Sequence, residues 1–362
     1  MKVGSSLRLV QLRMRSCSGL AEIFVVISCF LLGGGTAGAT VLNYKPLIME
    51  VLPNDSLVIQ GFEGGVKVIA GPSKSKEIQI RLKQENPEKL SAEAKSVLDE
   101  WHLSVQRKGD LIEVAIRSPQ SKSIWSKLLL GGIPQFYLEI SAPAMPLEIA
   151  LRKGPVWIEN WDTRMSVHLL SGGLSVVGGK GDARLSNGEG HIKVNDREGN
   201  LFIDSFKANL NATNCKGKME ISNFSGMTQM AKLNGHLFMN TSMGKVKLSG
   251  LVGRLDFENL DADLDLDGLQ GEIRGQNREG SLSLDLKGEA DVRIQSKEGP
   301  VSLRLPNSGA SVNLGTAEGQ LYVPNFLEVK RLPNLKWTRG RLRGEQPGSV
   351  YVRTIEGNIR IR

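Results

Sequence analysis

Glycine and apolar residues recur every nine positions through the central part of the chain. Between Met145 and Gly280, glycine occupies 12 of the 16 positions in this register. The residue two positions after each of them is apolar in 15 of 16 cases, and so is the residue four positions after. Apolar residues two apart, separated by polar ones, predict a short β-strand with one buried face. Asn, Asp, Ser and Gly are frequent six positions after the repeat position, and they predict a turn there.

A unit of nine residues is too short to enclose a core of its own, so successive units must stack on one another. Two units per turn, about 18 residues, would place two parallel sheets face to face with the apolar residues between them. Crossovers between parallel strands are overwhelmingly right-handed. The pattern therefore predicts an all-β fold, a right-handed parallel β-solenoid (β-helix) built from nine-residue half-turns.

The strength of the repeat divides the chain into regions. We expect a regular solenoid over 136–323 and closing solenoid strands over 348–362. The repeat is fainter over 40–135, which we interpret as an N-terminal β region. Within it, Asn86 and Pro87 are a typical helix start, and the apolar residues that follow share one face, so we expect an inserted α-helix over 86–101. This helix would cover the open end of the solenoid; a partner-binding helix is the alternative.

Two further segments interrupt the repeat. The segment 118–135 contains Trp125 and several leucines; we expect a self-packed loop, with a peripheral membrane contact as the alternative. The segment 324–347 is expected to be a solvated basic loop, although cations beside an aromatic residue could also bind an anionic glycan or lipid head group. The residues of this candidate site are Lys330, Arg331, Lys336, Trp337, Arg339, Arg341 and Arg343.

The first 39 residues have the pattern of a signal peptide. A basic start precedes the apolar residues 23–35 and the small residues 37–39, the arrangement that signal peptidase accepts. We expect export to the periplasm, the outer surface or the cell exterior, with an uncleaved N-terminal anchor as the alternative. Cleavage would leave Cys215 as the only cysteine, so no intramolecular disulfide is expected. Cys215 shares a corner column with Phe206 and Phe224, and we expect it to be a small buried hydrophobe.

The charged residues do not predict catalysis, a cofactor or a metal site. Lys and Arg outnumber Asp and Glu by only 46 to 38, too small an excess to indicate nucleic-acid binding. In an 18-residue turn, Asp263 and Asp265 lie beside Lys245 and Lys247, which predicts cross-strand ion pairs in place of a cation site. The repeat also lacks the regular Asp column of calcium-binding β-rolls. An enzyme that acts on acidic polysaccharides is the least favoured reading, because outward residues change from turn to turn.

A candidate ligand surface lies on one outer sheet. Phe202 and Phe238 fall two turns apart with Glu220 between them. Aromatic rings at this spacing could stack on sugar rings, while the carboxylate accepts hydrogen bonds from hydroxyls. Isolated exposed aromatics are also common on protein surfaces, which is the alternative for these two residues.

The strand-and-proline pattern of Phe136–Glu159 and the closing Gly348–Arg362 resemble a family of bacterial β-strand-repeat domains. These domains of unknown function are classed as proposed adhesins and are related to head GIN domains. The resemblance covers Ser56–Arg362. It implies a signal sequence, a right-handed β-helix and an envelope or extracellular location, and it supplies no catalytic residues. We therefore expect a non-catalytic, adhesin-like protein that binds a surface glycan or protein of the bacterial envelope; a structural envelope scaffold is the alternative.

Overall fold

The computed structural model describes residues 42–43, 46–61, 64–72, 75–85, 102–117, 135–306, 309–342 and 348–362. Every secondary-structure element within these ranges is a β-strand, and none of the described residues forms a helix that could cross a membrane. The expected signal peptide (1–39), the expected helix (86–101) and nearly all of the segment 118–135 lie outside the described residues; only Gln135 of the last segment is described, and it begins a strand.

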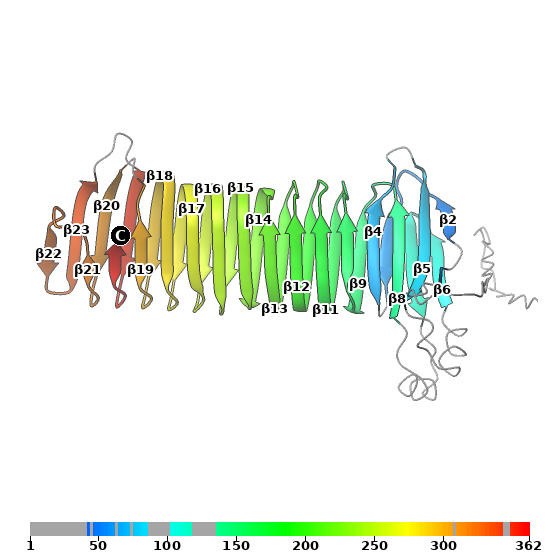
Figure 1. The fold of residues 1–362 in the computed structure, drawn as a ribbon, viewed down its shortest axis with the longest axis horizontal. Helices are drawn as coiled ribbons and strands as arrows, with labels where there is room; N and C mark the ends of the chain where they lie inside the picture. The colour runs from blue at the N-terminus through cyan, green and yellow to red at the C-terminus, as the bar shows by residue number, and fades with distance from the viewer. Residues whose placement is uncertain are drawn as a thin grey trace, which may run out of the picture.

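The centre of the molecule is a β-solenoid of about nine turns with about 18 residues per turn (Figure 1). Neighbouring strands are parallel and in register at that interval: Met165 pairs with Ala183, and Ala183 pairs with Leu201. Its strands are β9 (Leu147–Lys153), β10 (Val156–Glu159), β11 (Met165–Val177), β12 (Ala183–Asn195), β13 (Leu201–Thr213), β14 (Lys216–Ser225), β15 (Met227–Thr241), β16 (Lys245–Asn259), β17 (Asp263–Asn277), β18 (Leu282–Ser296) and β19 (Val301–Arg304). The predicted repeat length is confirmed.

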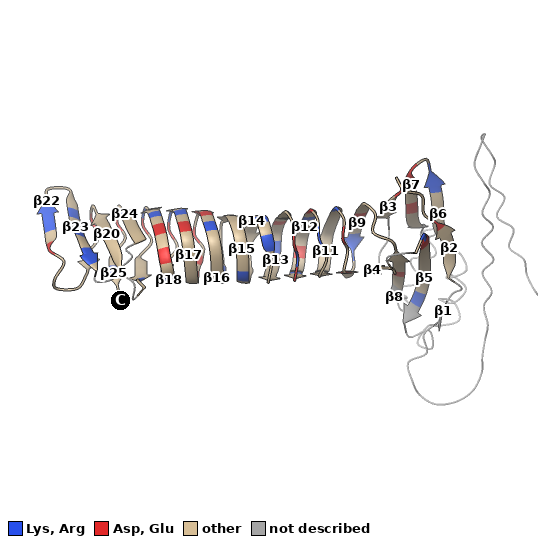
Figure 2. Cartoon of the chain, turned by 90° about the horizontal axis from the view of Figure 1, so that it is seen from above, with Lys and Arg blue, Asp and Glu red and all other residues tan. Residues whose placement is uncertain are grey.

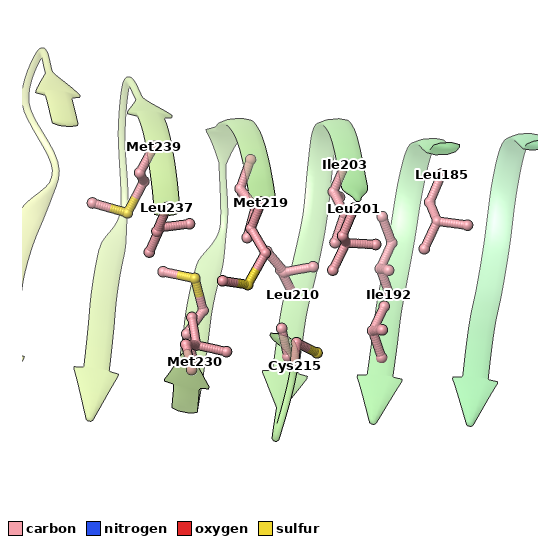
Figure 3. Packing of buried hydrophobic residues seen from close by; sticks show 14 of the residues in the cluster. Leu185, Ile192, Leu201, Ile203, Leu210, Cys215, Met219, Met230, Leu237 and Met239 are labelled. Atoms are coloured by element: carbon pink, nitrogen blue, oxygen red, sulfur yellow. The ribbon is translucent and has the colours of Figure 1, made fainter. Parts of the chain in front are cut away.

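Each turn contributes one half to each of two sheets. We call the sheet that contains Leu147–Leu151 and its equivalents sheet 1, and the sheet that contains Val156–Glu159 and its equivalents sheet 2. Residues two and four positions after each repeat position point inward and form one continuous core. Leu201 and Met219 from sheet 1 and Leu210 and Met230 from sheet 2 lie in this core, with Cys215 close by (Figure 3). Cys215 is buried, as predicted, and burial raises the pKa of its thiol.

The repeat glycines are required by the close stacking of turns. Gly190 has a φ of 126°, and a Cβ there would lie 2.0 Å from the carbonyl oxygen of Gly172 in the preceding turn. A larger residue would therefore have to separate the two turns at this bend. This constraint explains why glycine marks the nine-residue register more strictly than any other residue type.

The two corners of each turn differ in structure. At one corner, residues such as Asn160, Asp196 and Asn214 adopt a left-handed conformation with φ of 54–57°. At the other corner, the equivalent residues are buried and bond to one another from turn to turn. Asn259, for example, accepts a hydrogen bond from the Thr241 hydroxyl at 2.8 Å and donates one to Asn277 at 2.6 Å. The sequence predicted turns at both corners but treated them as one class.

The chain does not build the N-terminal end of the stack in sequence order. Strand β3 lies between β7 and β9, and β4 lies between β8 and β10. Antiparallel strands then close this end, β5 against β8 and β6 against β7. The strands here are β1 (Leu42–Asn43), β2 (Leu47–Glu50), β3 (Ser56–Gln60), β4 (Gly65–Ala70), β5 (Glu77–Glu85), β6 (His102–Lys108), β7 (Leu111–Arg117) and β8 (Gln135–Ala142).

The C-terminal end is built in the same way. The last two strands insert between earlier turns, β24 between β18 and β20, and β25 between β19 and β21 (Figure 1). The segment expected as a basic loop instead holds an antiparallel hairpin that pairs with β20 and ends the stack. The strands are β20 (Ala310–Thr316), β21 (Leu321–Tyr322), β22 (Val329–Leu332), β23 (Leu335–Leu342), β24 (Gly348–Thr354) and β25 (Ile359–Ile361).

Candidate ligand-binding surface

The three residues of the predicted ligand surface form one row on the outer face of sheet 1. Phe202 of β13 pairs with Glu220 of β14, which pairs with Phe238 of β15. Both rings are half-buried and the Glu220 carboxylate is exposed. In the preceding turn, the guanidinium of Arg184 lies 5.5 Å from the centre of the Phe202 ring. The row therefore alternates charged and aromatic side chains on a rigid sheet.

The next position in this row is Asp256, which contacts two neighbours. Its carboxylate accepts hydrogen bonds from Arg254 at 2.7 and 3.0 Å, and the Nε2 of His236 lies 2.6 Å from it. The bonds from Arg254, with a smaller contribution from His236, hold the pKa of the Asp256 carboxyl below its ordinary value. The contact between His236 and Asp256 was not predicted from the sequence. The two residues are 20 apart, which is one turn plus two positions. Because Arg254 occupies both carboxylate oxygens, the arrangement serves as an ion pair.

The basic residues predicted in 324–347 separate into two groups. Lys330, Trp337, Arg339 and Arg341 lie on the outer face of sheet 1, because the antiparallel register places Arg339 beside Asn313 and Trp337 beside Gly315. Lys336 and Arg331 alternate with this group and do not share its face. The Lys336 ammonium instead donates to the carbonyl oxygen of Gly319 at 2.8 Å. Arg343 lies outside the described residues.

The C-terminal end of this face combines cations with aromatic rings. The guanidinium of Arg353 lies 4.4 Å from the centre of the Tyr351 ring, and that of Arg293 lies 5.6 Å from it. The Lys330 ammonium lies 5.5 Å from the Trp337 ring. Blue bands mark this end on β22 and β23 in Figure 2. The two candidate surfaces that the sequence left separate thus belong to one face.

An exposed aromatic pair lies at the corner beside sheet 1. Phe206 is 54% exposed and Phe224 is 40% exposed, and their rings stack with centres 4.9 Å apart and planes 13° apart. The sequence grouped these residues with Cys215 in one corner column, and that grouping is wrong. Cys215 belongs to the opposite corner, where this column points inward; the phenylalanines belong to the corner where it points outward.

A groove of about 620 Å³ runs along the same corner nearer the C-terminus. One wall is the outermost row of sheet 1, which consists of Asn240, Glu258, Gln276, Gln295 and Arg353. The other wall continues the corner column of Phe224 and consists of Leu260, Arg278, Lys297 and Ile355. The floor includes the buried polar ladder of Thr241, Asn259, Asn277, Ser296 and Thr354. Sequence reasoning did not identify this groove, because it depends on which corner residues point outward.

The acidic cluster on sheet 2 has the register that the sequence predicted. Lys245 pairs with Asp263 and Lys247 with Asp265. The direct partner of Asp263 is nevertheless Ser281, whose backbone N–H donates at 3.1 Å and whose hydroxyl donates at 2.5 Å. These bonds, and then the charge of Lys245, lower the pKa of the Asp263 carboxyl. Within the described ranges, His, Cys, Asp and Glu side chains form no group of three or more that could hold a metal ion.

Comparison with known proteins identifies the family of the chain. The family model named Toastrack DUF4097 matches residues 73–362. The chain belongs to the Toastrack DUF4097 family. Comparison with curated proteins finds no match for this Toastrack chain.

Three solved structures are similar to this Toastrack chain over most of their length. A proposed cell adhesion protein from Clostridium sporogenes is 13% identical, with 88% of this chain and 98% of that one covered and a TM-score of 0.17. A proposed adhesin from Bacteroides fragilis is 10% identical, with coverage of 89% and 97% and a TM-score of 0.25. A proposed lipid-binding protein from Parabacteroides distasonis is 9% identical, with coverage of 88% and 96% and a TM-score of 0.27.

Proposed function

We propose that this protein is a non-catalytic, adhesin-like binding protein of the bacterial envelope, exported by the signal in residues 1–39, which contacts a surface glycan or protein through the outer face of sheet 1. The row Arg184, Phe202, Glu220 and Phe238 carries the proposal. The two phenylalanines lie two strands apart, roughly 10 Å at the usual strand spacing. Rings held at this interval on a sheet can stack on rings of an extended ligand while the charged residues bind its polar groups.

A rigid sheet suits such a role because its side chains are already in place before the ligand arrives. The backbone of sheet 1 is fixed by parallel pairing on both sides, and the inward residues lock it to the core. Little conformational entropy is then lost on binding, which favours affinity.

A structural scaffold that assembles end to end is the second candidate, and the C-terminal end of the solenoid argues against it. Strand β22 forms the C-terminal edge, and within four residues it presents Lys330 and Arg331. Charged residues on a short edge strand discourage pairing with another chain. Assembly through the outer faces would still be possible, and sedimentation at increasing protein concentration would detect it.

The proposal is tested with a double variant, Phe202→Ala with Phe238→Ala. We expect the variant to melt at nearly the temperature of the wild type, because both rings are on the outer face, and to lose binding to glycan arrays and to intact bacterial cells. The matched control is Phe206→Ala with Phe224→Ala, which removes a second aromatic pair away from this row. Unchanged binding by the folded Phe202→Ala, Phe238→Ala variant would refute the assigned surface. Cell fractionation with protease shaving tests the proposed location.

A further inference from the structure

We propose that the corner groove and the basic end of sheet 1 form one continuous track that binds a linear polysaccharide bearing carboxylates. The inference rests on the proposed function and specifies the class of ligand and a second contact area. The residues of the track differ from those of the Phe202 row, although the two areas are adjacent: Asn240 lies two residues from Phe238 on the same face of β15.

The shape of the track fits an extended polymer. The wall formed by sheet 1 crosses successive turns in direct register and consists of Asn240, Glu258, Gln276, Gln295 and Arg353. At the usual spacing of roughly 4.8 Å between strands, this row is about 20 Å long. A small compact ligand would use only one part of a groove with this form.

The chemistry of the central part fits hydroxyl groups. The side-chain amides of Asn240, Gln276 and Gln295 each offer both donors and an acceptor to a ligand. The two cations of the opposite wall are largely neutralised, because Arg278 pairs with Glu279 at 3.3 Å and Lys297 with Glu298 at 2.5 Å. The amides of the floor already bond along the ladder, so the floor is rigid.

The row continues beyond the groove to an aromatic platform. Arg353 pairs with Gly315, which pairs with Trp337. Gly315 has no side chain, and the Arg353 side chain occupies the space beside it, with its guanidinium donating to the Oδ1 of Asn313 at 2.8 Å. This arginine therefore lies between the groove and the half-buried indole ring. An indole beside a polar groove can stack on a sugar ring at the end of the track.

The charge at this end fits carboxylates. Arg293, Arg339, Arg341 and Lys330 are exposed around Tyr351 and Trp337. In the part of the chain that the structure describes, the acidic residues of this end include Asp291, beside Ser349, and the exposed Glu328, two positions before Lys330, so cations are in excess here. The cations are spread over several strands, and two of them, Arg293 and Lys330, lie over the half-buried rings of Tyr351 and Trp337. A polymer with repeated carboxylates matches this spread, because each cation can pair with a separate carboxylate.

The test uses the full chain and measures affinity for polygalacturonate and alginate, with a neutral galactan as the comparison. We expect both acidic polymers to bind, the neutral galactan to bind more weakly, and the affinity to fall with rising salt. Trp337→Ala should weaken binding about tenfold, and Gln276→Ala with Gln295→Ala by several-fold. Arg339→Gln with Arg341→Gln should weaken binding and reduce its salt dependence.

The matched control for the amides is Asn211→Ala with Gln229→Ala, which removes two amides from the outer face of sheet 2 and should leave affinity unchanged. The Arg339→Gln, Arg341→Gln variant changes only exposed side chains, so it remains informative if Trp337→Ala fails to fold. Absence of binding to both acidic polymers, equal affinity for the galactan, or equal losses in the control would overturn the inference. Cell binding that still depends on Phe202 and Phe238 would then leave the proposed function standing.

Discussion

Val246 and Lys247 are adjacent in the chain but belong to different environments. Val246 is 2% exposed and packs in the core, whereas Lys247 lies on the outer face of sheet 2. Val246→Asp would bury a carboxylate without a partner, and we expect it to cost about 3–5 kcal/mol of unfolding free energy. Lys247→Asp should cost far less, within about 1 kcal/mol. Denaturant unfolding of both variants measures the difference, and equal stabilities would contradict the register of β16.

The loss of stability at acidic pH should depend in part on Asp256. Its folded pKa lies below the ordinary value because of the bonds from Arg254 and then from His236. A carboxyl with a depressed pKa contributes stability above its unfolded pKa, near 3.9, and loses that contribution as the pH falls through the folded pKa. Asp256→Asn should therefore flatten the loss of Tm below about pH 4 relative to the wild type. A wild-type slope in Asp256→Asn would be the contrary result.

At this scale the sequence predicted the inward residues well and the corner residues only in part. The alternation of apolar and polar residues assigned Val246 and Lys247 correctly, because the strand geometry leaves two choices per residue. The corner column could not be resolved with a nine-residue period, since Phe206 and Cys215 are nine apart and point in opposite directions. An 18-residue period separates them. The missed contact between His236 and Asp256 has the same origin, because it also depends on neighbours in the next full turn.

At the scale of the elements, one buried arginine joins three turns. The Arg197 guanidinium donates to the carbonyl oxygens of Trp161 at 2.5 Å, Lys180 at 2.7 Å and Gly181 at 2.9 Å. Burial lowers its pKa. Gly179 leaves the necessary space, since a Cβ there would lie 2.6 Å from the guanidinium.

Replacement of Arg197 by leucine should therefore be strongly destabilising. The carbonyl oxygens would lose their donor while remaining buried, and we expect a cost of about 3–5 kcal/mol. The control Arg184→Leu, on the outer face of sheet 1, should cost less than about 1 kcal/mol. Chemical denaturation compares the two, and similar losses would show that Arg197 does not stabilise the stack.

The strands of the solenoid could be predicted from the sequence, but the hairpin of β22 and β23 could not be separated from a loop. Cations occupy both sets of alternating positions in this hairpin, so the apolar–polar alternation of the other strands cannot be recognised in its sequence. A turn signal was present, because Pro333 and Asn334 lie between the paired residues Leu332 and Leu335. The predicted loop was therefore wrong in conformation. Strand alternation, which a loop lacks, places Trp337 and Arg339 on the outer face and Lys336 away from it.

At the scale of the whole molecule, the repeat predicts the architecture but not the order of the turns at its ends. Every turn presents the same pattern of inward residues, so the pattern fits any neighbour equally well. The insertion of β24 between β18 and β20 is therefore invisible in the periodicity. The candidate groove could not be predicted for the same reason. Arg353 of β24 lies beside Gln295 of β18 only because β24 inserts next to β18.

The order of the turns gives a final prediction. Strands β24 and β25 contribute an interior layer, so removal of residues 348–362 takes away the layer that joins β18 and β19 to β20 and β21. We expect β20–β23 to lose protection in hydrogen exchange, while strands β9 to β17 keep theirs, because the stability of stacked repeats depends mainly on contacts between neighbours. The matched comparison is removal of 324–342, which takes away only the outermost hairpin and should leave β20 and β24 largely protected. If truncation at 348 left β20 as protected as in the full chain, the terminal layer would not be the connection that the register indicates.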